Sequence, residues 1–429
     1  MFTSFSTALS ALNATSTAID VVGNNLANLN TPGFKTSEVC FRDLVTQSLG
    51  AGLGETQVGF GTGTPLTVRE FSQGAIQTSA GVLDAAIQGD GFFIVNDSQG
   101  TTLYTRAGNF QVDKNGNLMT DTGDYVQGWT TIDPNTGHVV TNGPIGNIVV
   151  PVGSLKAPAA TSLFTIDCNL NSNAAPDTNT NANGTPDTSS DFSVPMRIYD
   201  SLGVSHVLTV SFEKTGANTW NYKVTIPGED VGQQAGTAVD LGADGSLTFG
   251  QDGKLPSGIS PIQINITGLA DGAADISDLS WNLYNPDGSG KITQYGQPSS
   301  SSASAQNGSG AAQLVHVGLA DGGGILAQYS DGEQVVVGQV AMASIRNPDT
   351  LIAEGNNTFQ LSARTANPSI GVPGTGGRGT IVGGAVEAST VDIATEFTNL
   401  IVYQRGYEAN AHVVTTADTL SQDTINLIH

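Results

Sequence analysis

The chain has 429 residues, of which 38 are acidic and only 15 are basic, so its formal net charge is −23. This charge repels phosphate backbones and anionic lipid head groups, which excludes nucleic acids and membrane surfaces as favoured partners. Charged residues make up 12% of the chain, about half the usual share, whereas its 54 glycines favour many short strands joined by tight turns.

A seven-residue repeat predicts a helix at the start of the chain. Its apolar or small residues alternate spacings of three and four, as in a coiled-coil seam: Phe2, Phe5, Leu9, Leu12, Ser16, Ile19, Gly23 and Leu26. Ala8, Ala11 and Ala18 lie beside this seam. Ser16 and Gly23 stand where a stable isolated coil would need Leu or Ile, and their small size predicts close approach of another backbone.

The segment NNLANLNTPGFK (24–35) ends this helix. Pro32 disfavours the helical conformation at Thr31, and Pro32-Gly33 suits the two central positions of a type II turn. The first basic residue is Lys35, and polar residues interrupt the apolar positions before it. A cleavable secretion signal needs a basic start and an unbroken apolar core, so we expect export, if it occurs, without such a signal.

The middle of the chain reads as β-structure. Segments 81–97 and 103–129 are predicted strands separated by Gly- and Asn-rich turns. A second block predicts a three-stranded meander, with turns at 200–203 and 214–217. Its apolar residues alternate with polar ones: Met196, Ile198, Leu208, Val210, Phe212, Trp220, Tyr222, Val224 and Ile226. A long loop (169–191) and a return linker (296–310) flank this block, and strands resume from 333 to 363.

The last part of the chain carries a second helical repeat. Its members are Ile393, Phe397, Leu400, Tyr407, Ala411 and Val414, continued after a shift of register by Ala417, Leu420 and Leu427. Each terminal helix has an apolar face without a local partner, so we expect the two to pair. The alternative is that each helix packs onto its own globular neighbour.

These elements predict a mainly β protein with terminal α-helices in a nested architecture. Segments 1–34 and 388–429 form a paired, coiled-coil-like helical domain, and 35–75 connects it to the rest. Segments 76–150 and 313–387 form a discontinuous inner β domain. Residues 151–312 form an inserted outer β domain.

The sequence offers no convincing catalytic, cofactor or metal site. The segment GTGGRG (374–379) lacks the strand–helix context of a dinucleotide site, and DKNGN (113–117) fits a hairpin turn better than a calcium loop. Cys40 and Cys168 are interpreted as small apolar fillers. The histidines are scattered singly, at His138, His206, His316, His412 and His429. We therefore expect a non-enzymatic protein without cofactors.

Three segments resemble the rod, hook and hook-associated proteins of the bacterial flagellum. Residues 24–35 are similar to the N-terminal signature of that family, and VEASTVDIATEFTNLIVYQRGYEANAHVVTTAD (386–418) to its C-terminal signature. Segments 83–95 and 104–118 resemble its shared β domain. Within the family, 197–224, 347–363 and 371–380 resemble the hook members. A hook-like distal rod protein is the alternative.

The resemblance implies a structural polymer rather than an enzyme. It implies export through the flagellar export apparatus and head-to-tail assembly into a hollow, curved tube outside the cell, at the hook and basal body, which acts as a universal joint. Rod, hook cap and hook–filament junction proteins are the implied partners besides the chain itself. The residues expected to mediate assembly lie in the helix seams and the turn: Phe5, Leu9, Leu12, Ile19, Leu26, Pro32, Gly33, Phe397, Leu400, Tyr407, Val414 and Leu420.

Other interpretations remain open at this stage. Leu29 stands where family members usually have Ala, and the loop 169–191 is longer than typical, which leaves the outer domain less defined. Some hook proteins are covalently joined through Cys and Lys, so Cys168 with Lys156 is an alternative role for that thiol. A secreted β-rich adhesin and an acid-rich hydrolase are more remote alternatives, since neither explains the apolar termini.

Overall fold

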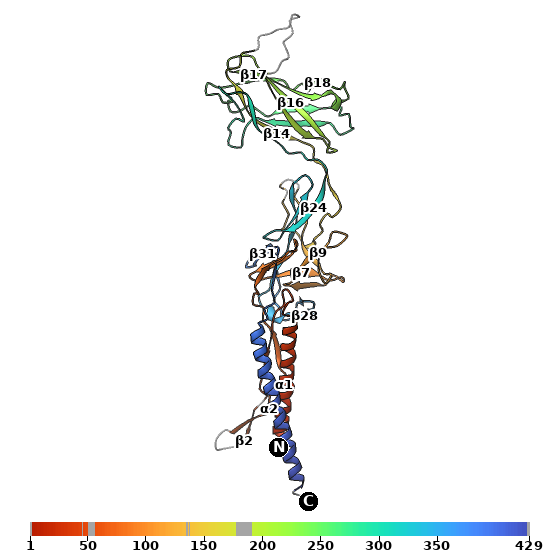
Figure 1. Cartoon of the computed structure of the whole chain (residues 1–429), viewed down its shortest axis with the longest axis vertical. Helices are drawn as coiled ribbons and strands as arrows, with labels where there is room; N and C mark the ends of the chain where they lie inside the picture. Colours follow the sequence, from red (N-terminus) through yellow and green to blue (C-terminus); the bar gives the residue numbers. More distant parts are fainter. Residues whose placement is uncertain are drawn as a thin grey trace. The chain divides into compact units, whose positions relative to one another are not determined.

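The computed structural model describes residues 2–44, 46–49, 56–133, 136, 138–176 and 191–426. The helices α1 (Phe2–Ala27) and α2 (Ile393–Asn426) stand at the ends of the chain, and nearly everything between them is β-structure (Figure 1). This confirms the predicted fold class. Leu427 and most of the predicted loop 169–191 lie outside the described residues. Neither helix, as far as it is described, combines the length and apolarity needed to cross a lipid bilayer.

The chain folds into two compact units. The first contains Met1–Val152, Val315–Gln328 and Glu333–His429, and the second contains Gly153–Leu314 and Tyr329–Gly332. The finer division into a helical domain, a connecting segment, an inner β domain and an outer β domain stays a prediction.

Strands from both halves of the chain interleave in the first unit. A central run has the order β26-β11-β7-β8-β29-β28, while β5 pairs with β32 and β6 pairs with β31. Phe92, Tyr104 and Phe359 pack together in its core. The strands before the second unit are β1 (Ser37–Cys40), β2 (Thr46–Leu49), β3 (Thr56–Gly59), β4 (Leu66–Arg69), β5 (Ile76–Thr78), β6 (Ala85–Gln88), β7 (Phe92–Asn96), β8 (Thr102–Thr105), β9 (Phe110–Val112), β10 (Leu118–Thr120), β11 (Tyr125–Trp129) and β12 (Gly146–Asn147).

After the second unit, the chain returns with a short 3-10 helix, η2 (Pro348–Thr350), and a further set of strands. These are β25 (Gly324–Tyr329), β26 (Gln334–Val340), β27 (Met342–Ser344), β28 (Ile352–Gly355), β29 (Thr358–Gln360), β30 (Ser369–Gly371), β31 (Thr380–Gly383) and β32 (Ala385–Glu387). The pairing of early strands with late ones means that neither half of the chain can complete this unit alone.

The second unit is a β-sandwich. One sheet has the order β15-β16-β17-β18 with β19 on β17, and the other has the order β20-β21-β14-β22 with β23 on β14. The sandwich strands are β14 (Leu163–Asn171), β15 (Phe192–Tyr199), β16 (Ser205–Lys214), β17 (Thr219–Pro227), β18 (Ala238–Asp240), β19 (Gly245–Thr248), β20 (Ile262–Ile266), β21 (Ile276–Asn282), β22 (Ile292–Tyr295) and β23 (Ser300–Gln306), and η1 (Gly228–Val231) is a 3-10 helix. The strands β13 (Leu155–Lys156) and β24 (Ala312–Leu319) flank the sandwich in the sequence and pair with each other outside its two sheets.

The predicted meander forms the first sheet of this sandwich. Met196 of β15 lies opposite Leu208 of β16, and Val210 lies opposite Val224 of β17. Their side chains enter one core shared with the second sheet, as expected when alternate residues of each strand face inward. The alternation of apolar and polar residues therefore predicted this sheet correctly.

The two cysteines differ in environment. Cys168 on β14 is buried in the sandwich core, and this burial raises the pKa of its thiol to about 12. Its interpretation as an apolar filler is confirmed, and a buried, protonated thiol is poorly suited to crosslinking. Cys40 is exposed, so the same interpretation was wrong for this residue. Burial alternates along β1, and Cys40 falls on the outward face.

The segments 113–117 and 374–379, which partly match a calcium loop and a dinucleotide-binding motif, form a turn and a loop in the structure. Asp113 Oδ1 accepts hydrogen bonds from the backbone N–H groups of Asn115 and Asn117, which closes the hairpin between β9 and β10. The segment 374–379 connects β30 to β31, so it has no helix at its end to hold a pyrophosphate group. Both predicted loop assignments are confirmed.

Candidate functional site

The helices α1 and α2 lie side by side and antiparallel within the first unit (Figure 1). Small residues make the contact: Ala8, Ala14 and Ala18 of α1 are buried, and a Cβ placed on Gly406 of α2 would lie 3.7 Å from Thr15 Cγ2. Small side chains allow two backbones to approach closely, which replaces the interlocking of large side chains. The predicted pairing of the terminal helices is confirmed.

The buried row of α1 is not the predicted seam. Ala8, Ala18 and Val22 face α2, whereas Phe5 and Leu9 are 41% and 47% exposed. The other members of the predicted seam are half-buried or exposed: Leu12, Ser16, Ile19, Gly23 and Leu26. Within the single chain the buried α1 residues therefore lie one row away from the predicted seam, and the role of that seam in assembly stays a prediction.

The predicted residues of α2 divide in the same way. Phe397, Tyr407 and Leu420 are exposed, while Leu400 and Val414 are half-buried. The inward side of α2 contains the predicted Leu400, Ala411, Val414 and Ala417 together with Glu396, Tyr403, Gly406, Asn410 and Ser421, all of which are buried or half-buried. Much of this side is small or polar. The pair therefore leaves most of its large apolar side chains on the outside.

A buried polar network fixes the end of α1 to the start of α2. Asn25 Nδ2 donates to Glu396 Oε1 over 2.9 Å and to the backbone oxygen of Ser37 over 2.9 Å. The Ser37 N–H donates back to Asn25 Oδ1. Glu396 Oε2 is buried and makes no hydrogen bond. Burial raises the pKa of Glu396 above its ordinary value, although the hydrogen bond from Asn25 opposes this shift.

α2 begins with a capped first turn. Asp392 Oδ1 accepts a hydrogen bond from the backbone N–H of Thr395 over 2.8 Å, which satisfies one of the free N–H groups at a helix start. This bond also holds the pKa of Asp392 below its ordinary value. The cap sets the residue at which α2 starts, and so places Glu396 opposite Asn25.

A buried charge cluster lies where the two terminal segments join the β-structure. Lys35 Nζ is 2.7 Å from Glu387 Oε1, and Arg106 NH1 is 3.5 Å from Glu387 Oε2. Lys35 and Glu387 are fully buried and Arg106 nearly so. Burial lowers the pKa of Lys35, and Glu387 partly offsets this. Glu387 Oε1 also accepts from the N–H of Gly74.

The turn after α1 rests against this cluster. Phe34 N–H donates to the Thr31 oxygen, and Gly33 N–H donates to the backbone oxygen of Glu387 over 2.7 Å. Gly33 has φ +69°, as the third position of a type II turn requires. A Cβ on Gly33 would lie 2.6 Å from the Ala107 nitrogen. Half-buried Pro32 and buried Gly33 thus form the predicted turn.

A polar cavity of about 460 Å³ opens beside this turn. Asn24, Asn28 and Pro32 line one side, and Arg69 and Asp121 are its two ionisable lining residues. One carboxylate and one guanidinium provide neither a nucleophile–base pair nor convergent carboxylates. The cavity therefore offers no recognisable catalytic arrangement.

Four family models match successive parts of the chain. They are "Flagella basal body rod protein" at 5–35, "Flagellar hook protein FlgE/F/G D1 domain" at 86–175, "Flagellar basal body protein FlaE D2 domain" at 169–309 and "Flagellar basal body rod FlgEFG protein C-terminal" at 382–427. The chain is 32% identical to the flagellar hook protein FlgE of Borreliella burgdorferi over 445 aligned residues, with 100% of both chains covered. The chain belongs to the flagellar hook protein family.

Other hook proteins agree with this assignment. FlgE of Escherichia coli K12 is 32% identical over 426 residues, with 99% of each chain covered. The crystal structure of Helicobacter pylori flagellar hook protein FlgE2 matches the fold with a TM-score of 0.52 at 15% identity, covering 71% of this chain and 99% of that one. The likeness to FlgE2 concerns the fold alone.

Sequence reasoning missed the charged and polar residues that join the two hook-family signatures. Lys35 and Glu387 are 352 positions apart, and Asn25 and Glu396 are 371 apart. No local periodicity relates such distant residues. A usable signal was the presence of Lys35 and Glu387 inside the two signature segments of a chain that has only 12% charged residues.

We expect Gly33→Ala to destabilise the first unit by about 3 kcal/mol or more. Positive φ costs a residue with a Cβ about 1–2 kcal/mol, and the clash with the Arg106–Ala107 backbone adds to that cost. Gly100→Ala is the matched control, since Gly100 has φ +82° with nothing within 4 Å of its Cβ position. Chemical denaturation followed by circular dichroism measures both. Equal losses in the two variants would contradict the close approach at Gly33.

We expect Glu387→Gln to destabilise the first unit by about 3–5 kcal/mol, because it leaves two buried cations without their counter-ion. Lys35→Met should cost less, since Arg106 and Glu387 remain as a balanced pair. The same denaturation measurement compares the variants, with exposed Glu354→Gln as the control. A larger loss for Lys35→Met than for Glu387→Gln would refute this account of the charge cluster.

We expect Glu396→Gln to remove a pH dependence of the helix pair. Because burial raises the folded-state pKa of Glu396 above 4.5, the folded protein holds this proton more tightly than the unfolded chain. The resulting stability is complete below the unfolded pKa and is lost as pH rises through the folded pKa. Melting of the helical signal at acidic and neutral pH tests this, with exposed Glu408→Gln as the control. Parallel pH profiles for wild type and Glu396→Gln would contradict the prediction.

Proposed function

We propose that the chain is the structural subunit of the bacterial flagellar hook and that it polymerises with itself into a hollow, curved helical tube. The observation that carries this proposal is the uncovered apolar surface of the helix pair. Phe397 and Leu420 of α2 are 51% and 54% exposed, and Phe5 and Leu9 of α1 are similarly uncovered. Clustered exposed apolar side chains of this size are typical of surfaces that bind another protein.

The exposed residues of α2 lie on both sides of its contact row. At 100° per residue, Ile393, Phe397 and Ile401 form one row, and Val402, Val413 and Leu420 form another on the opposite flank; all of these are exposed. Each helix pair can therefore be covered by neighbours on two different flanks. Two different contact surfaces on each subunit produce an open helical assembly rather than a closed dimer.

The β-structure supplies the outer contacts in this proposal. The inner β domain (76–150 and 313–387) and the inserted domain (151–312) would form outer layers around channel-lining helices. The chain is rich in Gly, Thr, Ser and Asn and poor in charged residues, which suits contacts that break and re-form as a curved tube rotates. The tube would thus act as a universal joint between the motor and the filament.

The proposed partners follow from hook-family membership. Besides copies of itself, the chain would contact rod, hook cap and hook–filament junction proteins, and it would reach its extracellular position through the flagellar export apparatus without a cleavable signal. A structural role requires no catalytic step, and no cofactor is part of this proposal.

We expect Phe397→Asp and Leu420→Asp to abolish polymerisation while both compact units stay folded. These side chains already lie in water in the single chain, so the substitutions cost little until assembly buries the new carboxylate, at several kcal/mol for each contact. Gln404→Asp, at another exposed position of α2, is the charge-matched control. Electron microscopy of purified protein under mild precipitant detects tubes, and circular dichroism checks folding. Normal tubes from both apolar-site variants would overturn the proposal.

A further inference from the structure

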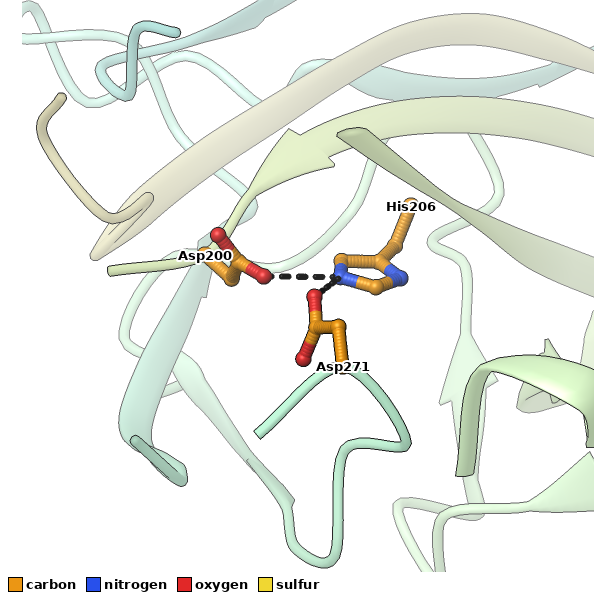
Figure 2. A group of neighbouring side chains, drawn as sticks. All are labelled: Asp200, His206 and Asp271. Carbon is orange, nitrogen blue, oxygen red and sulfur yellow. Dashed lines mark hydrogen bonds and ion pairs between the residues drawn. The ribbon is translucent and has the colours of Figure 1, made fainter. Parts of the chain in front are cut away.

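A group of ionisable side chains in the second unit has no part in the proposed assembly. Asp200 follows β15, His206 lies near the start of β16, and Asp271 lies in the loop between β20 and β21. Both carboxylates point to the same ring nitrogen (Figure 2). His206 Nε2 is 3.2 Å from Asp200 Oδ2 and 3.6 Å from Asp271 Oδ2.

Backbone hydrogen bonds hold the Asp200 side chain in place. Asp200 Oδ1 accepts hydrogen bonds from the N–H groups of Leu202 and Val204, over 2.8 and 2.9 Å. The Asp200 carboxylate is fully buried, and its other oxygen, Oδ2, faces His206.

The imidazole of His206 is buried and only partly satisfied. Its exposed fraction is 3%, and its Nδ1 makes no hydrogen bond, although Asp230 Oδ2 lies 3.3 Å away. Three carboxylates therefore surround one ring. The single Nε2 position faces two carboxylate oxygens at once.

We propose that Asp200, His206 and Asp271 bind a divalent first-row transition-metal ion of the Zn²⁺ type. Tetrahedral Zn²⁺ with ligand bonds of about 2.0–2.2 Å places neighbouring ligand atoms about 3.4 Å apart. The two separations from Nε2, 3.2 and 3.6 Å, lie on either side of that value, and all three ligand atoms lie within 4.8 Å of one another. The ion would replace the Nε2 proton with little movement of the ligands.

The surroundings match a histidine–metal site in two further respects. With Nε2 on the metal, Nδ1 would carry the proton, and Asp230 Oδ2 lies 3.3 Å from it, close enough for a small adjustment to give the carboxylate–histidine–metal arrangement that fixes ring orientation. Asp271 is 24% exposed, so water can reach the ion and complete its coordination. An imidazole ligand favours Zn²⁺-like ions over Ca²⁺ and Mg²⁺, which prefer oxygen ligands.

The ion would join the two sheets of the sandwich. Asp200 and His206 belong to the sheet that contains β15 and β16, while Asp271 belongs to the loop before β21 of the other sheet. Two backbone N–H groups of this loop already reach the other side: Ala270 N–H donates to the Asp230 oxygen over 2.9 Å, and Ala274 N–H donates to Ser201 Oγ over 3.0 Å. A metal link at this end would stiffen the second unit against relative movement of its sheets.

The test uses the full-length monomer, stripped with a chelator and titrated with Zn²⁺ by calorimetry. Asp271→Asn removes a metal ligand, and Asp275→Asn in the same loop is the matched control. The Asp275 carboxylate accepts a hydrogen bond from the Gly268 N–H, a bond that the Asn side-chain oxygen also makes. We expect wild type and Asp275→Asn to bind Zn²⁺ at this site and melt at higher temperature with the ion. Asp271→Asn should lose both effects.

Two further measurements distinguish Zn²⁺ binding at this site from binding elsewhere on the chain. Asp230→Asn should weaken Zn²⁺ binding about 10–100-fold, the usual effect of losing the orienting carboxylate. Co²⁺ added to the stripped wild type should give the intense visible bands of a tetrahedral site, and these should be absent in Asp271→Asn. Any binding by the other histidines is common to all variants. Equal Zn²⁺ binding by wild type and Asp271→Asn, or no change in melting of the wild type, would overturn the proposal, whether or not the chain assembles.

Discussion

The first unit depends on one constraint: two segments from opposite ends of the chain must meet at a single buried point. Glu387, just before α2, provides the carboxylate on which Lys35 and Arg106 converge. A buried carboxylate is tolerated only with close cationic or hydrogen-bonding partners, and all of these come from distant parts of the chain. The Pro32-Gly33 turn, the start of α2 and the pairing of β5 with β32 are all held at this point.

The position of the buried charge cluster also determines the register of the two helices. The Asn25–Glu396 hydrogen bond sets where α1 and α2 lie along each other, and alanines and Gly406 allow the two backbones to approach. An interface of small residues gains less from apolar burial than one of Leu and Ile. Several of the larger residues are thereby left exposed, where the proposed polymer would bury them. A subunit built in this way is more fully buried as part of a polymer than alone, which agrees with its membership of the hook family.

The second unit is stabilised mainly by its apolar core rather than by buried charges. Its sandwich has a large apolar core with stacked and edge-on aromatic contacts around Trp281, so the strands are well held at the centre. The Asp200–His206–Asp271 group lies among the turns at one end, where polar loops replace the core. An ion at this position would add a connection that apolar packing does not provide. The sequence alone predicts no metal site, because its histidines are scattered singly along the chain.

The sequence by itself determined the two terminal helices, the stop at Pro32-Gly33, the alternating strands of the meander and the hairpin at 113–117. These follow from local rules, since helix and strand periodicity and the demands of a turn act over a few residues. Only the tertiary structure decided which helical row is buried. Ala8 and Ala18 belong to one row and Phe5 and Leu9 to the next, and a 3.6-residue period fits both. The choice depends on how closely α2 can approach, and the partners of Lys35, Asn25 and His206 likewise depend on chain segments that no local pattern brings together.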